Sequence, residues 1–368
     1  MKFSILREDL IKPLTLVAGV VERRQTLPIL ANVLIVVRDG QMSLTGTDLE
    51  VELVARVDLS GDFVEGEITV PARKLNDICK SLPDGSTVTF DVDGDKVVVR
   101  SGRSRFTLST LSANDFPNVE DSPASYKFTM AQDQLKTLID STAFAMAQQD
   151  VRYYLNGMLW EVKQNSLRLV ATDGHRLAMC NEEIDADVSG THQVILPRKG
   201  VIELGRLLDG GDALIELTLG NNHIRAVTQA FTFTSKLIDG KFPDYERVLP
   251  RVSDKIVMAN RKDLREAFVR AAILSNEKYR GVRLMLEMGE LKIYANNPDH
   301  EEAEEVVSVE YQGNNLEIGF NVSYLLDVLA VIPGDTIRFS MSDSNSSATI
   351  EDSAESDKAL YVVMPMRL

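Results

Sequence analysis

Cysteine and long apolar runs are both scarce in the sequence. Only Cys79 and Cys180 occur among 368 residues. Two cysteines so far apart exclude a disulfide scaffold and a cysteine-based metal site, and they are typical of a reducing compartment. The longest aliphatic run, residues 33–37, is far shorter than the roughly 20 residues that a membrane helix needs. The N-terminal residues lack the apolar stretch of a signal peptide, so we expect a cytoplasmic protein with no membrane partner.

Motifs for catalysis and cofactor binding are missing as well. The sequence contains neither of the phosphate-binding glycine patterns GxxxxGKS/T and GxGxxG, and it contains no GxSxG nucleophile elbow. Its histidines are scattered without the spacing of zinc ligands. Asp173 and His175 would supply two members of a catalytic triad, but no motif marks a serine as the third. These absences predict a protein that is not an enzyme and uses no metal or cofactor.

The charge of the chain is negative overall but unevenly distributed. The formal net charge is −15, which by itself argues against a nucleic-acid partner. Six segments with the apolar spacing of helices nevertheless carry +5 together, which leaves −20 for the remainder. If these helices line one surface, that surface is mildly basic, although each helix alone is typical of a solvated mixed face. The segments are residues 7–24, 73–80, 132–152, 198–209, 261–280 and 321–331.

Two blocks of sequence recur in the same order at intervals of about 125 residues. A strand followed by a polar signature reads SLTGTDLE at 43–50, RLVATDGHR at 168–176 and KIYANNPD at 292–299. An extended segment that leads into a helix recurs at a similar interval, so the chain is a threefold repeat. Each repeat is predicted to be α+β, with two helices packed on antiparallel sheets. The predicted domains are residues 1–124, 125–252 and 253–368.

The first and third repeats carry patches of opposite charge. Arg100, Arg103 and Arg105 cluster near the end of the first repeat, around Phe106 and Leu108. The third repeat has an acidic run, whose members are Asp299, Glu301, Glu302, Glu304 and Glu305. A solvated acidic loop is the simpler interpretation of this run alone. Together the two patches predict head-to-tail association of copies that closes a ring.

Long stretches of the chain are shared with one known family. They are TLPIL (26–30), SLTGTDLE (43–50), RSGRSRF (100–106), QDVRYYLNGML (149–159), ATDGHRLA (171–178), RAAILSNEKYRGVRL (270–284), EIGFNVSYLLDVL (317–329) and the terminal YVVMPMRL. In these stretches the chain resembles bacterial DNA polymerase III beta subunits, the replicative sliding clamps. The resemblance implies three tandem repeats of the DNA-clamp fold and a head-to-tail homodimer. Two chains would form a six-domain ring around duplex DNA, as a non-catalytic processivity factor in replication and repair.

The resemblance also implies a DNA-binding surface that ignores base sequence. The family's DNA contacts fall on Arg24, Arg73, Gln149, Tyr153 and Tyr154, with Arg198 and Lys199 as further basic candidates. Each neutralised phosphate steepens the salt dependence by a log–log slope of about −0.9, so tight contacts would pin a protein that must slide. We therefore expect topology, rather than affinity, to keep the ring on DNA. The segment 321–331 has no basic residue and is the weakest candidate.

The dimer interface of the family maps onto both ends of this chain. Phe106 and Leu108 are expected to pack against Ile273 and Leu274 of the second copy. Charged pairing is expected around them, from Lys74, Arg103 and Arg105 to Asp299, Glu302 and Glu305. Because exposed ion pairs are individually weak, the apolar residues should supply most of the closure energy.

A protein-binding cleft is the last site that the resemblance implies. Its positions are Leu155, Thr172, Gly174, His175, Arg176, Leu177, Pro243, Arg247, Val248, Ser347, Val362, Val363, Met364, Pro365, Met366 and Arg367. Flexible methionine side chains suit a groove for several peptides, and Pro365 lacks the N–H that would continue the last strand. The expected partners are the DNA polymerase III catalytic subunit, the clamp loader, other polymerases and repair proteins. Without the resemblance, residues 362–366 would be a core strand and His175 a buried histidine.

Two other functional classes remain open at this point. A nuclease with scattered carboxylates would cleave DNA in a metal-dependent way, and a repeat scaffold would bind only proteins. A clamp differs from both because it stays on closed circular DNA and runs off when the circle is linearised.

Overall fold

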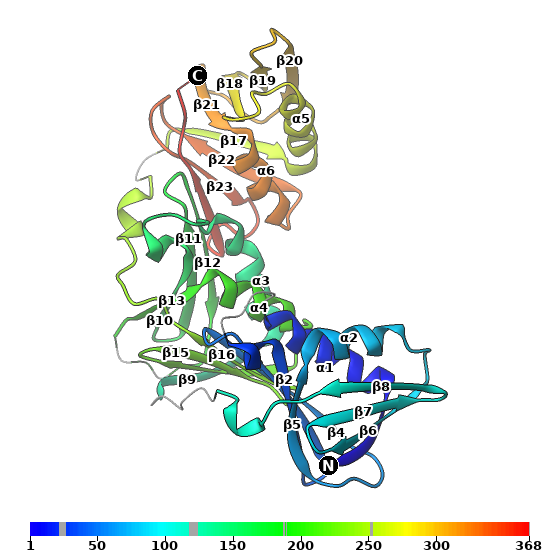
Figure 1. The fold of residues 1–368 in the computed structure, drawn as a ribbon. Coiled ribbons are helices and arrows are strands. Elements are labelled where there is room, and N and C mark those ends of the chain that lie inside the picture. Colours follow the sequence, from blue (N-terminus) through cyan, green and yellow to red (C-terminus); the bar gives the residue numbers. More distant parts are fainter. Residues whose placement is uncertain (22–26, 118–123, 187, 189, 251–252, 368) are drawn as a thin grey trace. The chain divides into compact units, whose positions relative to one another are not determined.

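The computed structural model describes residues 1–21, 27–117, 124–186, 188, 190–250 and 253–367. Arg24, one of the expected DNA contacts, lies outside these residues. Figure 1 shows the helices and strands of the chain, which divides into two compact units. Unit 1 comprises Met1–Asp133 and Lys199–Leu237, and unit 2 comprises Gln134–Arg198 and Ile238–Leu368.

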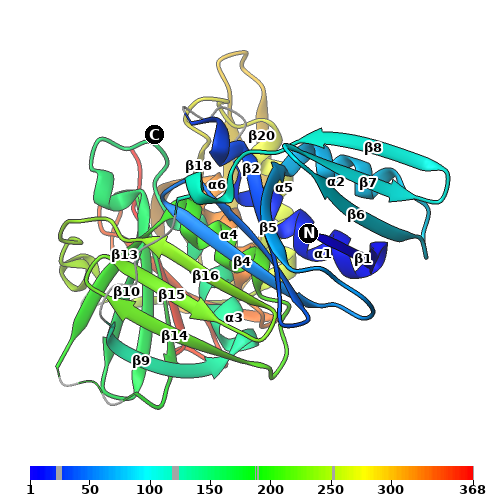
Figure 2. The ribbon, with the colours of Figure 1, turned by 60° about the horizontal axis from the view of Figure 1, so that its bottom comes forward.

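Unit 1 contains an eight-stranded antiparallel sheet in the order β5-β2-β3-β4-β16-β15-β14-β9 and a four-stranded sheet in the order β1-β6-β7-β8 (Figure 2). The strands of the larger sheet are β2 (Asn32–Arg38), β3 (Gln41–Thr47), β4 (Val51–Asp58), β5 (Gly66–Pro71), β9 (Ala124–Ala131), β14 (Leu214–Gly220), β15 (His223–Val227) and β16 (Phe231–Lys236). Those of the smaller sheet are β1 (Lys2–Leu6), β6 (Thr87–Asp93), β7 (Lys96–Ser101) and β8 (Ser104–Ser109). The helical elements are α1 (Arg7–Val20), α2 (Ala72–Ser81), nearly all of α4 (Arg198–Leu207), and the short 3-10 turns η1 (Pro28–Ala31) and η2 (Ala113–Asp115).

Unit 2 repeats this arrangement, with sheets in the orders β13-β10-β11-β12-β24-β23-β22-β17 and β20-β19-β18-β21. The strands of the larger sheet are β10 (Gly157–Lys163), β11 (Ser166–Thr172), β12 (Arg176–Glu183), β13 (His192–Pro197), β17 (Lys255–Asn260), β22 (Thr336–Met341), β23 (Ala348–Asp352) and β24 (Ala359–Val363). Those of the smaller sheet are β18 (Gly281–Glu287), β19 (Glu290–Asn296), β20 (Glu302–Ser308) and β21 (Leu316–Asn321). The helical elements are most of α3 (Gln132–Thr142), α5 (Arg261–Ile273), α6 (Val322–Val331), η3 (Ala143–Ala145), η4 (Tyr153–Leu155) and η5 (Tyr245–Val248).

The strand orders confirm the predicted threefold repeat and the α+β class. One pattern, in which the fourth strand pairs with the first, recurs as β5-β2-β3-β4, β13-β10-β11-β12 and β21-β18-β19-β20. In both large sheets the third strand of one such group pairs with the last strand of the following repeat, β4 with β16 and β12 with β24. The central repeat therefore contributes strands to both units.

Helix α1 shows how the apolar periodicity places a helix on a sheet. Leu10, Leu14 and Val17, predicted to share one face, are fully buried. Gly46 of β3 lies beneath Val17, where a side chain on the strand would collide with the helix. The small residue thus permits the close approach of α1 to the sheet.

Gly46→Ala is expected to destabilise the protein by about 1–3 kcal/mol, because overpacking a buried contact shifts the backbone. The added Cβ would lie 2.8 Å from Val17 Cγ1 and 2.9 Å from the Val17 carbonyl oxygen. Urea unfolding measures the change. Gly19→Ala on the exposed side of α1 is the matched control, since its nearest neighbour, Glu203, is 3.8 Å away and helical alanine stabilises by up to about 1 kcal/mol. Equal midpoints for Gly46→Ala and the wild type would contradict this packing argument.

Two predicted helices are wrong at their C-terminal ends. The predicted helix 132–152 ends at Thr142, whose hydroxyl donates to the Leu138 carbonyl at 2.7 Å before η3 begins. The predicted helix 261–280 ends at Ile273. There the Asn276 side chain accepts bonds from the backbone N–H groups of Lys278 and Tyr279 at 2.9 and 3.0 Å. Side chains that bond local backbone compete with helical bonds, and apolar spacing does not reveal them. No helix in the described part of the chain is long and apolar enough to cross a membrane.

Candidate functional site

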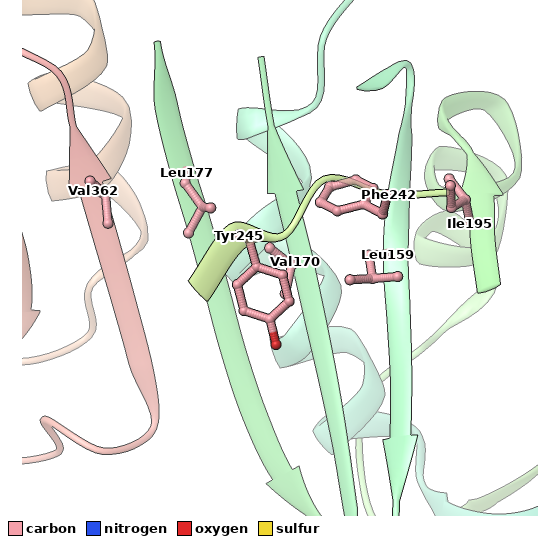
Figure 3. Packing of buried hydrophobic residues seen from close by; sticks show 7 residues of the cluster. All are labelled: Leu159, Val170, Leu177, Ile195, Phe242, Tyr245 and Val362. Carbon is pink, nitrogen blue, oxygen red and sulfur yellow. The ribbon is translucent and has the colours of Figure 1, made fainter. Parts of the chain in front are cut away.

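A cavity of about 160 Å³ in unit 2 gathers residues from three distant segments. It is lined by Arg152, Leu155, Thr172, Gly174, Arg176, Leu177, Pro243, Asp244, Tyr245, Val248, Ser347, Val362 and Met364. Beside it lies a buried cluster on one face of the large sheet, made by Leu159, Val170, Leu177, Ile195, Phe242, Tyr245 and Val362. Figure 3 shows Phe242 and Tyr245 on a single segment in front of the strands that carry Leu159, Val170 and Leu177. The lining is largely apolar and suits apolar side chains of a ligand.

The turn between β11 and β12 forms one side of the cavity. The Asp173 carboxylate accepts bonds from the backbone N–H groups of His175 and Arg176 at 2.9 and 3.0 Å, and the Thr172 hydroxyl donates to the Arg176 carbonyl. Gly174 has a φ of 89° and packs against the Arg152 guanidinium, so a side chain there would be strained and crowded. The Thr-Asp pair that recurs at Thr47-Asp48 makes the same bonds there, so this signature encodes a bonded turn between two strands.

Arg176 lines the cavity, but its guanidinium is bonded within the protein. The nitrogens donate to Asp173, to Asp327 on α6 and to the Phe144 carbonyl, and the group lies 4.5 Å from the ring centre of Tyr324. Its side chain is 12% exposed. The residue therefore offers its stem to the cavity and uses its charge to join the turn to α6.

Arg152 connects the cavity to the loop before η4. Its guanidinium bonds both carboxylate oxygens of Asp150 at 3.0 and 2.9 Å and also donates to the Asp173 carbonyl. The side-chain bonds from Arg152 to this carboxylate, with the bond from the Arg152 backbone N–H, lower the pKa of Asp150 to about 2. Asp150 therefore remains ionised, and its ion pair with Arg152 does not titrate, in the physiological pH range.

The C-terminal segment passes from the cavity to the small sheet of unit 2. The strand β24 ends at Val363, after which Met364 N–H donates to the His175 carbonyl at 2.9 Å and Met366 N–H to the Gly319 carbonyl at 2.8 Å. Val362 faces the cavity, whereas Val363 on the opposite face of the strand is fully buried. The last strand thus contributes both to the core and to the cavity.

The cavity brings together most of the residues expected in the cleft, but not all. His175, Arg247, Val363, Pro365, Met366 and Arg367 do not line it. His175 is exposed and stacks near Tyr324, so the alternative of a buried histidine is wrong. Arg247 points to solvent and pairs with Asp244 at 2.7 Å. Sequence reasoning missed Arg152, Asp244 and Tyr245. The one available signal was the pair Phe242 and Tyr245, two aromatic residues in an otherwise polar segment.

The side chains expected to contact DNA differ in their exposure and in the bonds that they already make within the protein. In unit 1, Arg73 is exposed and donates one bond to the Val21 carbonyl at 3.2 Å, while Lys199 is ion-paired with the nearly buried Asp48. In unit 2, Gln149 and Tyr153 are exposed, whereas Tyr154 and Arg198 already contact other residues. Tyr154 packs against the buried cluster, and Arg198 donates to the Met146 carbonyl at 3.3 Å.

The residues expected at the dimer interface lie at two sheet edges. Arg103, Arg105, Phe106 and Leu108 lie on or beside β8 at one edge of unit 1, with Lys74 exposed on α2. In unit 2, Glu302 and Glu305 belong to the edge strand β20, Asp299 is exposed in the turn before it, and Ile273 and Leu274 end α5. Glu305 forms a two-pronged ion pair with Arg270, which lowers the pKa of Glu305.

Neither a metal cluster nor a reactive thiol stands out in the described part of the chain. No group of three or more His, Cys, Asp or Glu side chains there is placed to hold a metal ion. Cys79 and Cys180 are buried, and burial raises the pKa of each thiol to about 11. A thiol with so high a pKa is a poor nucleophile at neutral pH.

Models of the DNA polymerase III beta subunit match nearly the whole chain. The N-terminal domain matches residues 1–120, the central domain 129–244 and the C-terminal domain 246–367. The beta sliding clamps of Pseudomonas aeruginosa and Escherichia coli K12 are 65% and 56% identical to it, each over 100% of both chains. A crystal structure of the Pseudomonas aeruginosa clamp bound to griselimycin is similar to this chain, with a TM-score of 0.98 and 65% sequence identity. The structure of Caulobacter crescentus pol III beta is similar with a TM-score of 0.93 and 39% identity. Both comparisons cover 100% of each chain.

Three tandem α+β repeats, with sheets that continue from one repeat into the next, define a DNA clamp subunit. The chain belongs to the DNA polymerase III beta subunit family. Its function is accordingly that of a sliding clamp, a processivity factor in DNA replication.

Proposed function

We propose that two copies of this chain close head to tail into a six-domain ring around duplex DNA in the cytoplasm. The ring acts without catalysis, metal or cofactor. It holds the DNA polymerase III catalytic subunit, the clamp loader, other polymerases and repair proteins through short peptides in the cavity. The domains of this proposal are residues 1–124, 125–252 and 253–368.

The observation that carries the proposal is the pair of sheet edges β8 and β20. Repeat boundaries within the chain are closed by pairing β4 with β16 and β12 with β24. By its place in the repeat, β20 corresponds to β4 and β12, and β8 corresponds to β16 and β24. Among the described strands, β8 and β20 each end a four-stranded sheet. Pairing β8 of one copy with β20 of another would complete a third eight-stranded sheet, and doing so twice closes a ring.

Side chains at the two edges support the same pairing. Phe106 in β8 corresponds to Phe233 in β16 and to Tyr361 in β24. Each is the last residue in a row of direct cross-strand partners that runs across the sheet of its repeat. Phe233 and Tyr361 are buried, whereas Phe106 is only half-buried in a single chain. Tyr361 contacts Phe144, and the corresponding position in the third repeat is Ile273, the last residue of α5. The Ile273–Phe106 contact expected between copies thus has a counterpart within the chain.

Charge supports the pairing as well. Arg100 and Arg105 are direct cross-strand partners, and like charges in that position repel unless anions lie nearby. The β20 edge offers such anions in Glu302 and Asp299. Glu305, which already pairs with Arg270, is a weaker candidate than these two. The ion pairs would fix orientation, and the apolar contacts would supply most of the energy.

The surface that we propose to face DNA is only weakly basic. Lys199 is neutralised by Asp48, so Arg73, Gln149 and Tyr153 are the most accessible contacts among the described residues of the expected set. A small number of phosphate contacts keeps affinity low and sliding fast. Enclosure would then account for retention on DNA.

The ring is expected to remain on closed circular DNA after loading and to be lost from it within seconds of linearisation, because only topology retains it. Gel filtration of circles carrying labelled protein, before and after restriction, measures this. A linear duplex blocked at both ends with bound streptavidin is the control, and it should retain the protein.

The alternative functions make different predictions in the same experiment. A nuclease would consume the circle in a metal-dependent way, and a protein-only scaffold would never co-elute with it. Release at equal rates from intact and cut circles would overturn enclosure. Because the Pseudomonas aeruginosa relative is solved with griselimycin, we also propose that griselimycin binds this chain.

A further inference from the structure

A row of polar side chains crosses the large sheet of unit 2 next to the buried cluster. Gln193, Glu161, Arg168 and Asn181 lie on four adjacent strands and are direct cross-strand partners. Gln193 donates to Glu161 at 2.6 Å, and Arg168 donates to Asn181 at 2.6 Å. None of the four lines the cavity. We call them the polar row.

The hydroxyl of Tyr245 is bonded into this row at its centre. It receives a bond from Arg168 Nη1 at 2.9 Å and donates to Glu161 Oε1 at 3.1 Å. Glu161 is 4% exposed and also bonds Lys163 at 2.7 Å. Burial raises the pKa of Glu161, but the bonds from Lys163, Gln193 and Tyr245 outweigh it, so the pKa lies below its ordinary value. The carboxylate is therefore a permanent acceptor for the tyrosine at neutral pH.

Tyr245 belongs to the segment 242–248, which forms one wall of the cavity through Pro243, Asp244, Tyr245 and Val248. This wall has little regular structure beyond the single turn η5. The rings of Phe242 and Tyr245 hold it to the sheet (Figure 3), and Arg168 lies 3.8 Å from Glu246 in the same turn. Removing the Tyr245 hydroxyl would remove the two bonds that fix this wall to the polar row, while leaving its apolar packing intact.

We propose that the polar row is a positioning device for peptide binding, in which Glu161 and Arg168 hold Tyr245 and so fix where Pro243 and Val248 meet a bound peptide. The inference rests on the peptide-binding function proposed above. A wall that is already in place spares the peptide the entropy of ordering it, so the gain lies mainly in a slower dissociation rate.

The test uses the full-length protein and a fluorescein-labelled hexapeptide that ends in Leu-Phe, whose apolar side chains match the lining. Tyr245→Phe is expected to bind it about fivefold more weakly by anisotropy, with the change in the dissociation rate. Glu161→Ala should weaken peptide binding by the same factor. Glu161→Gln should keep most of the wild-type affinity, because its amide oxygen still accepts a bond from the Tyr245 hydroxyl. In the Tyr245→Phe background, Glu161→Ala should add no further loss.

Controls separate positioning from general damage. Tyr311→Phe removes another buried tyrosine hydroxyl, which donates to the Asn314 carbonyl at 2.7 Å, and should bind as the wild type does. If Tyr245→Phe does not reach the wild-type mass and melting temperature, Arg168→Lys, which cannot reproduce both bonds of the guanidinium, takes its place with the same expected loss. Unchanged affinity in the folded variant, or independent losses in the double variant, would overturn the inference alone. A wild-type protein that does not bind the peptide would overturn the peptide-binding function and the inference with it.

Discussion

A chain carrying Ile273→Ala and Leu274→Ala is expected to be monomeric in light scattering at about micromolar concentration, where the wild type should have twice the mass of 40.9 kDa. Ile273 is 73% exposed in the single chain, and Leu274 is half-buried. Truncating a packed isoleucine or leucine to alanine costs about 2–5 kcal/mol, whereas an exposed ion pair contributes about 0.2–1 kcal/mol. The rim charges therefore cannot hold the copies together once the apolar contact is lost.

Val269→Ala is the matched control for this variant. Val269 lies one turn earlier on α5 and is 43% exposed, but the proposed contact with Phe106 does not include it. It should remain dimeric and stay on circular DNA, and the double variant should lose both properties. A dimeric mass for the double variant would show that the edges β8 and β20 do not meet through these side chains.

The fold could be predicted from the sequence because its signals are local or repeated. Apolar spacing placed Leu10, Leu14 and Val17 on the buried face of α1, and the recurring blocks predicted three similar domains. Both depend on patterns that a single chain displays in order. The ends of α3 and α5 were mispredicted because apolar spacing contains no information about local side-chain bonds, such as those of Thr142 and Asn276 near these ends.

The candidate site could be predicted only in part, because long-range partners decide what each side chain does. Lys199 looks like a free cation in the sequence, yet its partner Asp48 lies 151 residues away. Arg168 and Tyr245, which meet beside the cavity wall, are 77 residues apart. Charge counts and motif spacing contain no information about such pairs. The resemblance predicted a cleft from residues of which the cavity gathers most, but it did not indicate that the charge of Arg176 is used within the protein or that Tyr245 lines the cavity.

Deleting residues 364–368 is expected to abolish binding of the labelled hexapeptide, a loss of at least about 100-fold or about 2.8 kcal/mol. Met364 lines the cavity and is 43% exposed, so its flexible side chain is available to a ligand. The deletion also removes the bonds from Met364 N–H to the His175 carbonyl and from Met366 N–H to the Gly319 carbonyl. Both the lining and the two attachments that hold this segment beside β12 and β21 are lost together.

The strand β24 ends at Val363, so the core and the dimer should survive this deletion. Removing only Leu368 is the control, because Met364 and both backbone bonds remain, and this variant should bind the peptide normally. The peptide affinity of Met364→Ala should lie between those of the two deletions, since this variant loses the side chain but keeps both backbone bonds. Anisotropy that is unchanged after the five-residue deletion would place the peptide elsewhere. In that case retention on circular DNA would persist, because the peptide cavity and the ring closure depend on different residues.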